Sequence, residues 1–141
     1  MRAQFIRGAA DPRDTMDLGD VLGRKIKNFD LKSSSVFNHM LSSMVDEEDP
    51  DEYEKVKKIL FRYFPYIAII QLALDEIGLS VDDYDESNTM ADGIYEVYMD
   101  RGNILKEFKN WCEATIELLE DMSEEKFDSK KYKDLIKKIK I

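Results

Sequence analysis

The chain has 141 residues, of which 43% are hydrophobic and 36% charged, and its formal net charge is −9. A chain of this length can bury one self-sufficient core, and its hydrophobic content exceeds that of disordered chains. The single cysteine excludes an intramolecular disulfide framework, and no Cys/His spacing fits a zinc site. The acidic balance argues against a dedicated duplex-DNA binder, because binding to phosphates needs clustered Lys and Arg.

The first 32 residues predict an N-terminal arm followed by a short helix. Asp11 and Pro12 form a helix start, since Asp caps free backbone amides and Pro fits the first helical position. Gly19 is then expected to end this helix. Residues 25–31 alternate partially between polar and apolar, so they could pair with residues 3–7 as a short N-terminal β-ribbon.

Residues 33–125 predict a helical core. A helix over 36–45 follows three serines that can cap it, and Asp49 with Pro50 starts a second, longer helix. Pro65 must either kink that helix or end it, because proline removes one backbone hydrogen bond. The run after Pro65 is apolar on nearly every side until Gly78, which predicts a helix surrounded by others.

The second half begins with an ambiguous element, residues 93–99, which fits a helical face but is equally rich in strand-favouring residues. From Ile104 to Met122 apolar residues recur at alternating spacings of four and three, which predicts a helix of roughly five turns. A last helix begins at Asp128 or Ser129, with its lysines on the exposed side and its apolar residues buried: Tyr132, Leu135, Ile136 and Ile139.

These elements predict a compact all-α bundle of five to six helices in a single domain, with the N-terminal β-ribbon as an option. Residues 1–32 form the arm and short helix, 33–125 the core, and 126–141 a basic C-terminal helix. The N-terminus lacks the apolar stretch of a secretory signal, and the most apolar run, 59–74, is too short and too interrupted to span a membrane. We therefore expect a cytoplasmic protein that does not contact a membrane.

Charge is unevenly distributed along the chain. Residues 68–100 contain nine carboxylates and no Lys or Arg, a run whose self-repulsion indicates a surface for a basic partner. The candidate partner-binding residues in it are Asp82, Asp83, Tyr84, Asp85, Glu86, Asp92 and Glu96. Residues 126–141 have seven lysines against two aspartates. The candidate residues of this basic tail are Lys130, Lys131, Lys133, Lys137 and Lys138.

No motif in the sequence predicts a catalytic residue, a metal site or a cofactor. The acidic run does not fit a calcium loop, because counting from Asp83 places Asn88 at the sixth position and Ile94 at the twelfth, where Gly and Glu are needed. His39, the only histidine, has no evident catalytic partner in the sequence and is expected to be a surface or half-buried residue. Cys112 is expected to be a small buried hydrophobe with a raised pKa.

An alternative is an all-α hydrolase in which carboxylates one helical turn apart hold Mg²⁺. Glu117 and Glu120 have this spacing, as do Glu125 and Asp128. The arrangement resembles the paired acidic motifs of all-α nucleoside triphosphate pyrophosphohydrolases, and the resemblance covers these four positions only. That family draws its pairs from two helices well separated in sequence, whereas these positions are almost consecutive.

The leading hypothesis is a non-enzymatic binding module: an adaptor, regulator or inhibitor whose acidic surface captures a basic protein surface, including one that normally holds nucleic acid. The basic tail is interpreted as a solvated helix face that contacts the acidic run within the molecule or in a neighbouring subunit. Contact between subunits would make the protein a homo-oligomer, and such self-assembly is a third hypothesis.

Overall fold

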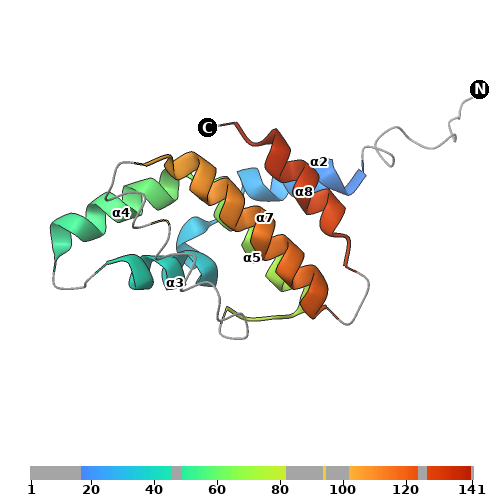
Figure 1. Cartoon of the computed structure of the whole chain (residues 1–141), viewed down its shortest axis with the longest axis horizontal. Coiled ribbons are helices and arrows are strands. Elements are labelled where there is room, and N and C mark those ends of the chain that lie inside the picture. The colour runs from blue at the N-terminus through green and yellow to red at the C-terminus, as the bar shows by residue number, and fades with distance from the viewer. Residues whose placement is uncertain (1–16, 46–48, 82–93, 95–101, 124–126, 141) are drawn as a thin grey trace, which may run out of the picture.

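The computed structural model describes residues 17–45, 49–81, 94, 102–123 and 127–140 (Figure 1). Every element in these ranges is helical, which confirms the predicted all-α bundle. The elements are α2 (Asp17–Lys27), the 3₁₀ turn η1 (Leu31–Ser33), α3 (Ser35–Met44), α4 (Pro50–Arg62), α5 (Phe64–Ile77), α7 (Ile104–Met122) and α8 (Ser129–Lys138).

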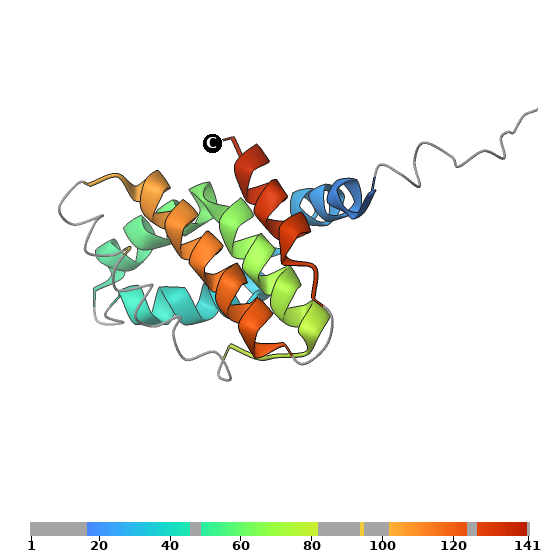
Figure 2. The same ribbon diagram turned by 45° about the vertical axis from the view of Figure 1, so that its right-hand side comes forward.

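Helix α5 lies at the centre of the bundle and contacts all the other α-helices named above. Helix α7 runs beside it in the same direction, while α8 runs back along α7 and packs on α2 (Figures 1 and 2). The central position of α5 follows from its sequence, since an apolar surface on nearly every side must be covered by neighbours. Five consecutive residues at its start, Tyr66 to Ile70, are buried.

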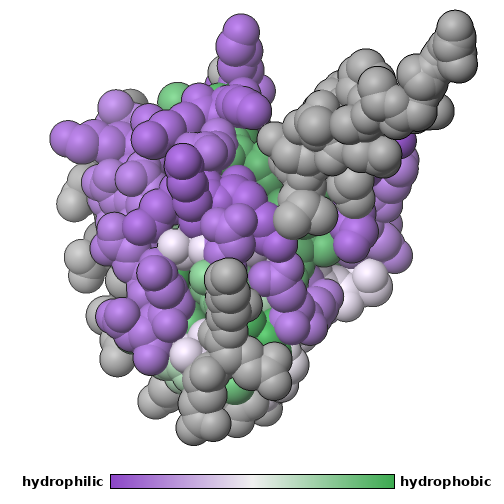
Figure 3. All heavy atoms as spheres, turned by 90° about the vertical axis from the view of Figure 1, so that its right-hand side faces the viewer, coloured by the Kyte–Doolittle hydropathy of each residue, from purple (hydrophilic) through white to green (hydrophobic). Residues whose placement is uncertain are grey.

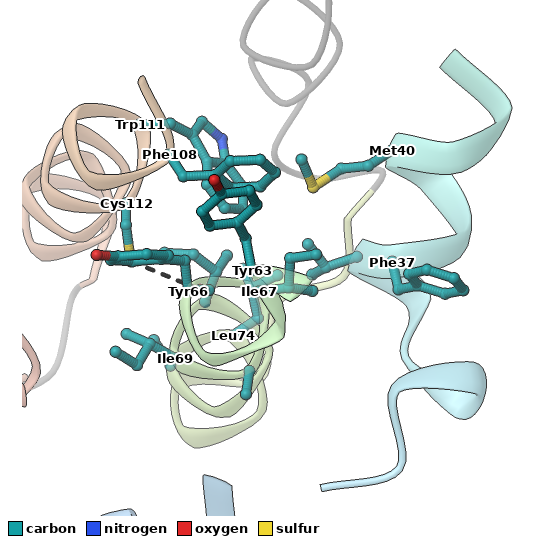
Figure 4. Close-up of a cluster of buried hydrophobic side chains, with 14 of the residues drawn as sticks. Phe37, Met40, Tyr63, Tyr66, Ile67, Ile69, Leu74, Phe108, Trp111 and Cys112 are labelled. Atoms are coloured by element: carbon teal, nitrogen blue, oxygen red, sulfur yellow. Dashed lines mark hydrogen bonds between the residues drawn. The ribbon is translucent and has the colours of Figure 1, made fainter. Parts of the chain in front are cut away.

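The core is richest in aromatic residues where α5 and α7 begin to pack. The Tyr63 ring stacks on Phe108 with centroids 4.9 Å apart, and Trp111 meets the edge of Phe108 at 6.1 Å. Met40 and Phe37 approach from α3 (Figure 4). Aromatic pairs of this geometry add about 0.5–1.5 kcal/mol each beyond their buried area. The outer surface contrasts with this core, and Figure 3 shows a face that is mostly hydrophilic with narrow hydrophobic strips between.

The helix boundaries confirm several of the sequence signals. Asp49 caps α4 by accepting a hydrogen bond from the Glu52 amide, and Pro50 is the first residue of that helix. Pro65 ends one helix and starts the next rather than kinking a continuous one, because α4 stops at Arg62 and α5 starts at Phe64. Gly78 ends α5 in the left-handed conformation, with φ of 74°.

The predictions for the N-terminal third are wrong in two respects. Gly19 does not end a helix, since it lies within α2. Residues 25–31 do not form a strand: they belong to the end of α2, a short link and η1, while residues 3–7 and 12–16 lie outside the described part of the chain. Leu22 and Ile26 are buried in the core, and α2 packs on α5 and α8, so tertiary packing overrides two glycines with low helix propensity.

Two glycines provide a matched pair of stability tests. Gly23 lies inside α2, and an added Cβ would meet nothing within 4 Å, so Gly23→Ala should raise the free energy of unfolding by about 0.5–1 kcal/mol. Gly78 has equal space around it but a positive φ, so Gly78→Ala should lower that free energy by about 1–2 kcal/mol. Urea denaturation measures the free energy of unfolding of both variants. Changes of the same sign would contradict the different backbone conformations assigned to the two glycines.

Candidate functional site

The acidic segment, residues 82–93, is held at both ends by buried side chains. Val81 is 5% exposed and Ile94 is fully buried, and both belong to the hydrophobic core. All seven candidate partner-binding residues, from Asp82 to Glu96, lie outside the described residues. Within the ambiguous element 93–99, only Ile94 is described, and it is helical.

The described helices and the rest of the chain differ sharply in charge. The described residues contain 16 Lys or Arg and 16 Asp or Glu, so they are neutral overall. The remaining residues contain 5 basic and 14 acidic side chains and carry the whole net charge of −9. The largest single share belongs to the acidic segment, with five carboxylates and no cation. Excess negative charge is therefore concentrated outside the described residues rather than spread over the described helices.

Two lysines of the basic tail are paired with carboxylates of the same chain. Lys131 Nζ donates to Glu76 Oε1 at 2.7 Å, and Lys133 Nζ lies 3.3 Å from Glu117 Oε1. Glu76 belongs to the predicted acidic run, so the tail contacts that run within the molecule at this point. The Lys131 side chain is only 14% exposed, so the prediction that all the tail lysines lie on the exposed side is wrong for it.

The other candidate residues of the tail remain on the surface. Lys130, Lys137 and Lys138 are exposed, while Tyr132 and Ile136 on the opposite side of α8 are buried as predicted. Phe127 stacks on Tyr132 with ring centroids 5.3 Å apart, and both rings are buried. Neither ring is therefore available to stack on a nucleic-acid base.

Two of the four carboxylates proposed for Mg²⁺ binding have protein partners. Glu117 pairs with Lys133, and Glu120 accepts a hydrogen bond from the Ser129 hydroxyl. Asp128 is the residue before α8, while Glu125 lies outside the described residues. In the described ranges no three His, Cys, Asp or Glu side chains are grouped so that they could hold a metal ion. These observations do not favour the phosphohydrolase hypothesis.

His39 is half-buried in α3 and lines a pocket of about 450 Å³. Its Nε2 atom is buried and has no hydrogen-bond partner among the described residues. The other residues around this pocket are small and polar except for Val81: Ser35, Asn38, Ser42, Ser43 and Ser80. No carboxylate of the described residues lines the pocket to orient the imidazole, so a general-base role is not supported.

Cys112 and Tyr132 are held in their neutral forms. Burial raises the pKa of the Cys112 thiol well above its usual value, with a further contribution from Glu113, and its Sγ lies 3.5 Å from the Tyr66 carbonyl oxygen. Burial and the nearby Glu76 carboxylate raise the pKa of Tyr132. The prediction that Cys112 is a buried residue with a raised pKa is confirmed, and it lacks the thiolate character of a nucleophile.

These pKa shifts predict a loss of stability at alkaline pH. The unfolded chain releases the Cys proton near pH 9 and the Tyr protons near pH 10, whereas the native state keeps them, so the free energy of unfolding falls as pH rises above about 9. Each group contributes up to about 1.4 kcal/mol per pH unit. Denaturation midpoints at pH 8, 9 and 10 measure the fall. Cys112→Ala should flatten the change between pH 9 and 10, and an unchanged slope in that variant would contradict the assignment to Cys112.

Gln71 is a polar residue whose structural role the sequence did not reveal. Its Oε1 accepts hydrogen bonds from the Ser34 hydroxyl at 2.8 Å, the Ser35 hydroxyl at 3.0 Å and the Val36 amide at 3.0 Å. Its Nε2 donates to Asp75. Gln71 on α5 therefore satisfies donors at the start of α3, next to the pocket of His39. The only feature of the sequence that pointed to this role is the position of Gln71 inside a long apolar run.

None of the helices in the described ranges has the length and apolar character needed to cross a membrane. Comparisons with protein-family models, with curated proteins and with solved structures gave no match.

Proposed function

We propose that this protein is a non-enzymatic binding module that presents the acidic segment to a basic surface of a partner protein, as an adaptor, regulator or inhibitor. The observation that carries the proposal is the burial of Val81 and Ile94 on either side of a segment with five carboxylates and no cation. Anchoring both ends restricts the segment before binding, so less conformational entropy is lost on association.

The described residues, which we call the helical framework, are neutral overall, and this neutrality supports the same function. A single-signed segment on a neutral framework directs the electrostatic attraction of a basic partner to one part of the molecule. Tyr84 within the segment adds a residue type that is enriched in protein interfaces. Two tail lysines are already paired with Glu76 and Glu117, and this pairing reduces their competition for the acidic segment.

The test begins by recovering the tagged protein at low salt from the cells that produce it and eluting bound proteins with salt. The affinity of the eluted partner is then measured by calorimetry for the wild type and for Asp82→Asn/Asp83→Asn/Asp85→Asn/Glu86→Gln. Removing four charge pairs worth roughly 0.2–1 kcal/mol each should weaken binding by a factor between about four and about a thousand.

A matched control removes the same number and types of carboxylate from the helical framework: Asp51→Asn/Glu54→Gln/Asp121→Asn/Asp128→Asn. All four residues are exposed, and in the described structure none of them has a side-chain ion pair or hydrogen bond. This variant should bind within about twofold of the wild type, because exposed charges away from the interface are screened by salt. Equal weakening by both variants would show that net charge, and not the acidic segment, determines binding.

A further inference from the structure

A groove of about 430 Å³ lies where the end of α2, η1 and the junction between α4 and α5 meet. Three phenylalanines line it, and one of them, Phe61, is 37% exposed. The inner side of Phe61 contacts the edge of the buried Phe37 ring, with centroids 5.6 Å apart. The groove therefore offers a fixed aromatic surface to a partner side chain. The full set of lining residues is Lys27, Phe29, Asp30, Leu31, Lys32, Phe61 and Phe64.

The segments that form the groove are basic. Residues 24–32 have four cations and one carboxylate, and residues 57–64 have three cations and none. The one carboxylate, Asp30, accepts a hydrogen bond from the Lys32 amide and so caps η1. Across the described residues no carboxylate oxygen lies within 4 Å of the Nζ atom of Lys27 or Lys32, in contrast to Lys131 and Lys133 of the tail. The two ammonium groups at the rim of the groove are thus unpaired within the described part of the chain.

An occupant that fits this groove has an apolar ring flanked by carboxylates. Residues 82–86 of the chain read Asp-Asp-Tyr-Asp-Glu and have this composition. We propose that the groove of one copy binds residues 82–86 of a second copy, with Tyr84 against Phe61 and the flanking carboxylates beside Lys27 and Lys32. This inference rests on the proposed function, since the binding element is the same acidic segment. It gives a homo-oligomer held through the groove rather than through the basic tail.

Reciprocity favours this occupant over a nucleic acid. A single-stranded oligonucleotide also combines rings with negative charge, but it has no groove of its own with which to form a second contact. A second copy brings its acidic segment to the groove and offers its own groove in return. Two such contacts around a twofold axis would form a closed dimer.

The test is sedimentation velocity from 1 to 300 μM at 0.1 M salt. The wild type should show concentration-dependent association, and Lys27→Glu/Lys32→Glu should weaken it at least about tenfold. The control, Lys106→Glu/Lys109→Glu, makes the same change at exposed lysines of α7 outside the groove. Phe61→Ala is a second groove variant, and its control is Leu105→Ala, because Leu105 is 40% exposed and also outside the groove. Thermal melts verify that each variant is folded.

Mixing experiments identify the two halves of the contact. Lys27→Glu/Lys32→Glu retains the acidic segment, and Asp82→Asn/Asp83→Asn/Asp85→Asn/Glu86→Gln retains the groove. Each alone should associate at least about tenfold more weakly than the wild type, and their equimolar mixture should associate more strongly than either variant alone, through one of the two contacts. A wild type that stays monomeric to 300 μM, or groove variants that associate like the wild type, would overturn the proposal. So would a dT₁₅ oligonucleotide whose binding is lost in the groove variants while self-association is unchanged.

The outcomes separate this inference from the proposed function. If only the inference is wrong, the acidic-segment variant loses the partner eluted from cells while the wild type remains monomeric. If the proposed function is wrong, this variant binds the eluted partner like the wild type, whatever its self-association. The groove variants should retain that partner in either case.

Discussion

Replacing Ile94 by alanine is expected to lower the free energy of unfolding by about 2–5 kcal/mol. The Ile94 side chain is fully buried, and truncation removes buried methyl and methylene groups and leaves a cavity. The residues on both sides of Ile94 lie outside the described part of the chain. Substitutions at exposed positions rarely lower the free energy of unfolding this much, so a loss of this size would show that the Ile94 side chain belongs to the core. Urea denaturation measures it, and a loss below about 1 kcal/mol would show that Ile94 is not anchored in the core.

The same substitution separates anchoring from general stability. Ile116→Ala on α7 is the matched control, since Ile116 is also fully buried but lies outside the connection that carries the acidic segment. Both variants should lose similar stability, whereas only Ile94→Ala should weaken binding of the basic partner, by roughly threefold to tenfold, because the freed segment loses more entropy on binding. If Ile94→Ala and Ile116→Ala bound the basic partner with equal affinity at a temperature where both variants are folded, the anchoring role of Ile94 would be contradicted.

Replacing Gln71 by methionine is expected to lower the free energy of unfolding by about 2–3 kcal/mol. Methionine keeps the length of the side chain but removes the acceptor of three hydrogen bonds, including that of the partly buried Val36 amide. A buried donor left without a partner costs about 1–3 kcal/mol, while water can reach the exposed Ser35 hydroxyl. Hydrogen exchange at the Val36 amide should accelerate in the same variant.

The comparison for Gln71 is Asp49→Ala, which removes a single capping hydrogen bond at an exposed position of α4. Loss of such a cap costs about 1 kcal/mol. Gln71→Met should therefore destabilise the protein more than Asp49→Ala does. The reverse order would show that the start of α3 does not depend on the bonds from α5.

Elements with local signals were predictable from the sequence. Asp49 with Pro50 and Gly78 mark helix ends through their own backbone preferences, and the spacing of apolar residues from Ile104 to Met122 defines one helical face. Helix α2 was not predictable in this way. Two glycines within it signal a break, and only the burial of Leu22 and Ile26 against distant helices offsets their low propensity.

The candidate site was predictable only in part for the same reason. The sequence identified the acidic run and the basic tail, but the ion pair between Lys131 and Glu76 joins residues 55 positions apart. The contact of Gln71 with the start of α3 joins residues 35 to 37 positions apart. Ile94 fitted a helical face in the sequence, but its role as an anchor depends on burial in a core that no local pattern specifies.

The salt dependence of partner binding tests the central proposal most directly. The dissociation constant of the eluted partner is measured from 0.05 to 0.5 M salt for the wild type, for Asp82→Asn/Asp83→Asn/Asp85→Asn/Glu86→Gln and for the framework control. Screening weakens exposed ion pairs, so the wild type and the control should lose affinity steeply with salt, and the acidic-segment variant should start weaker and change little. If all three proteins had the same affinity and the same dependence on salt, the proposal that the acidic segment binds the partner would be contradicted.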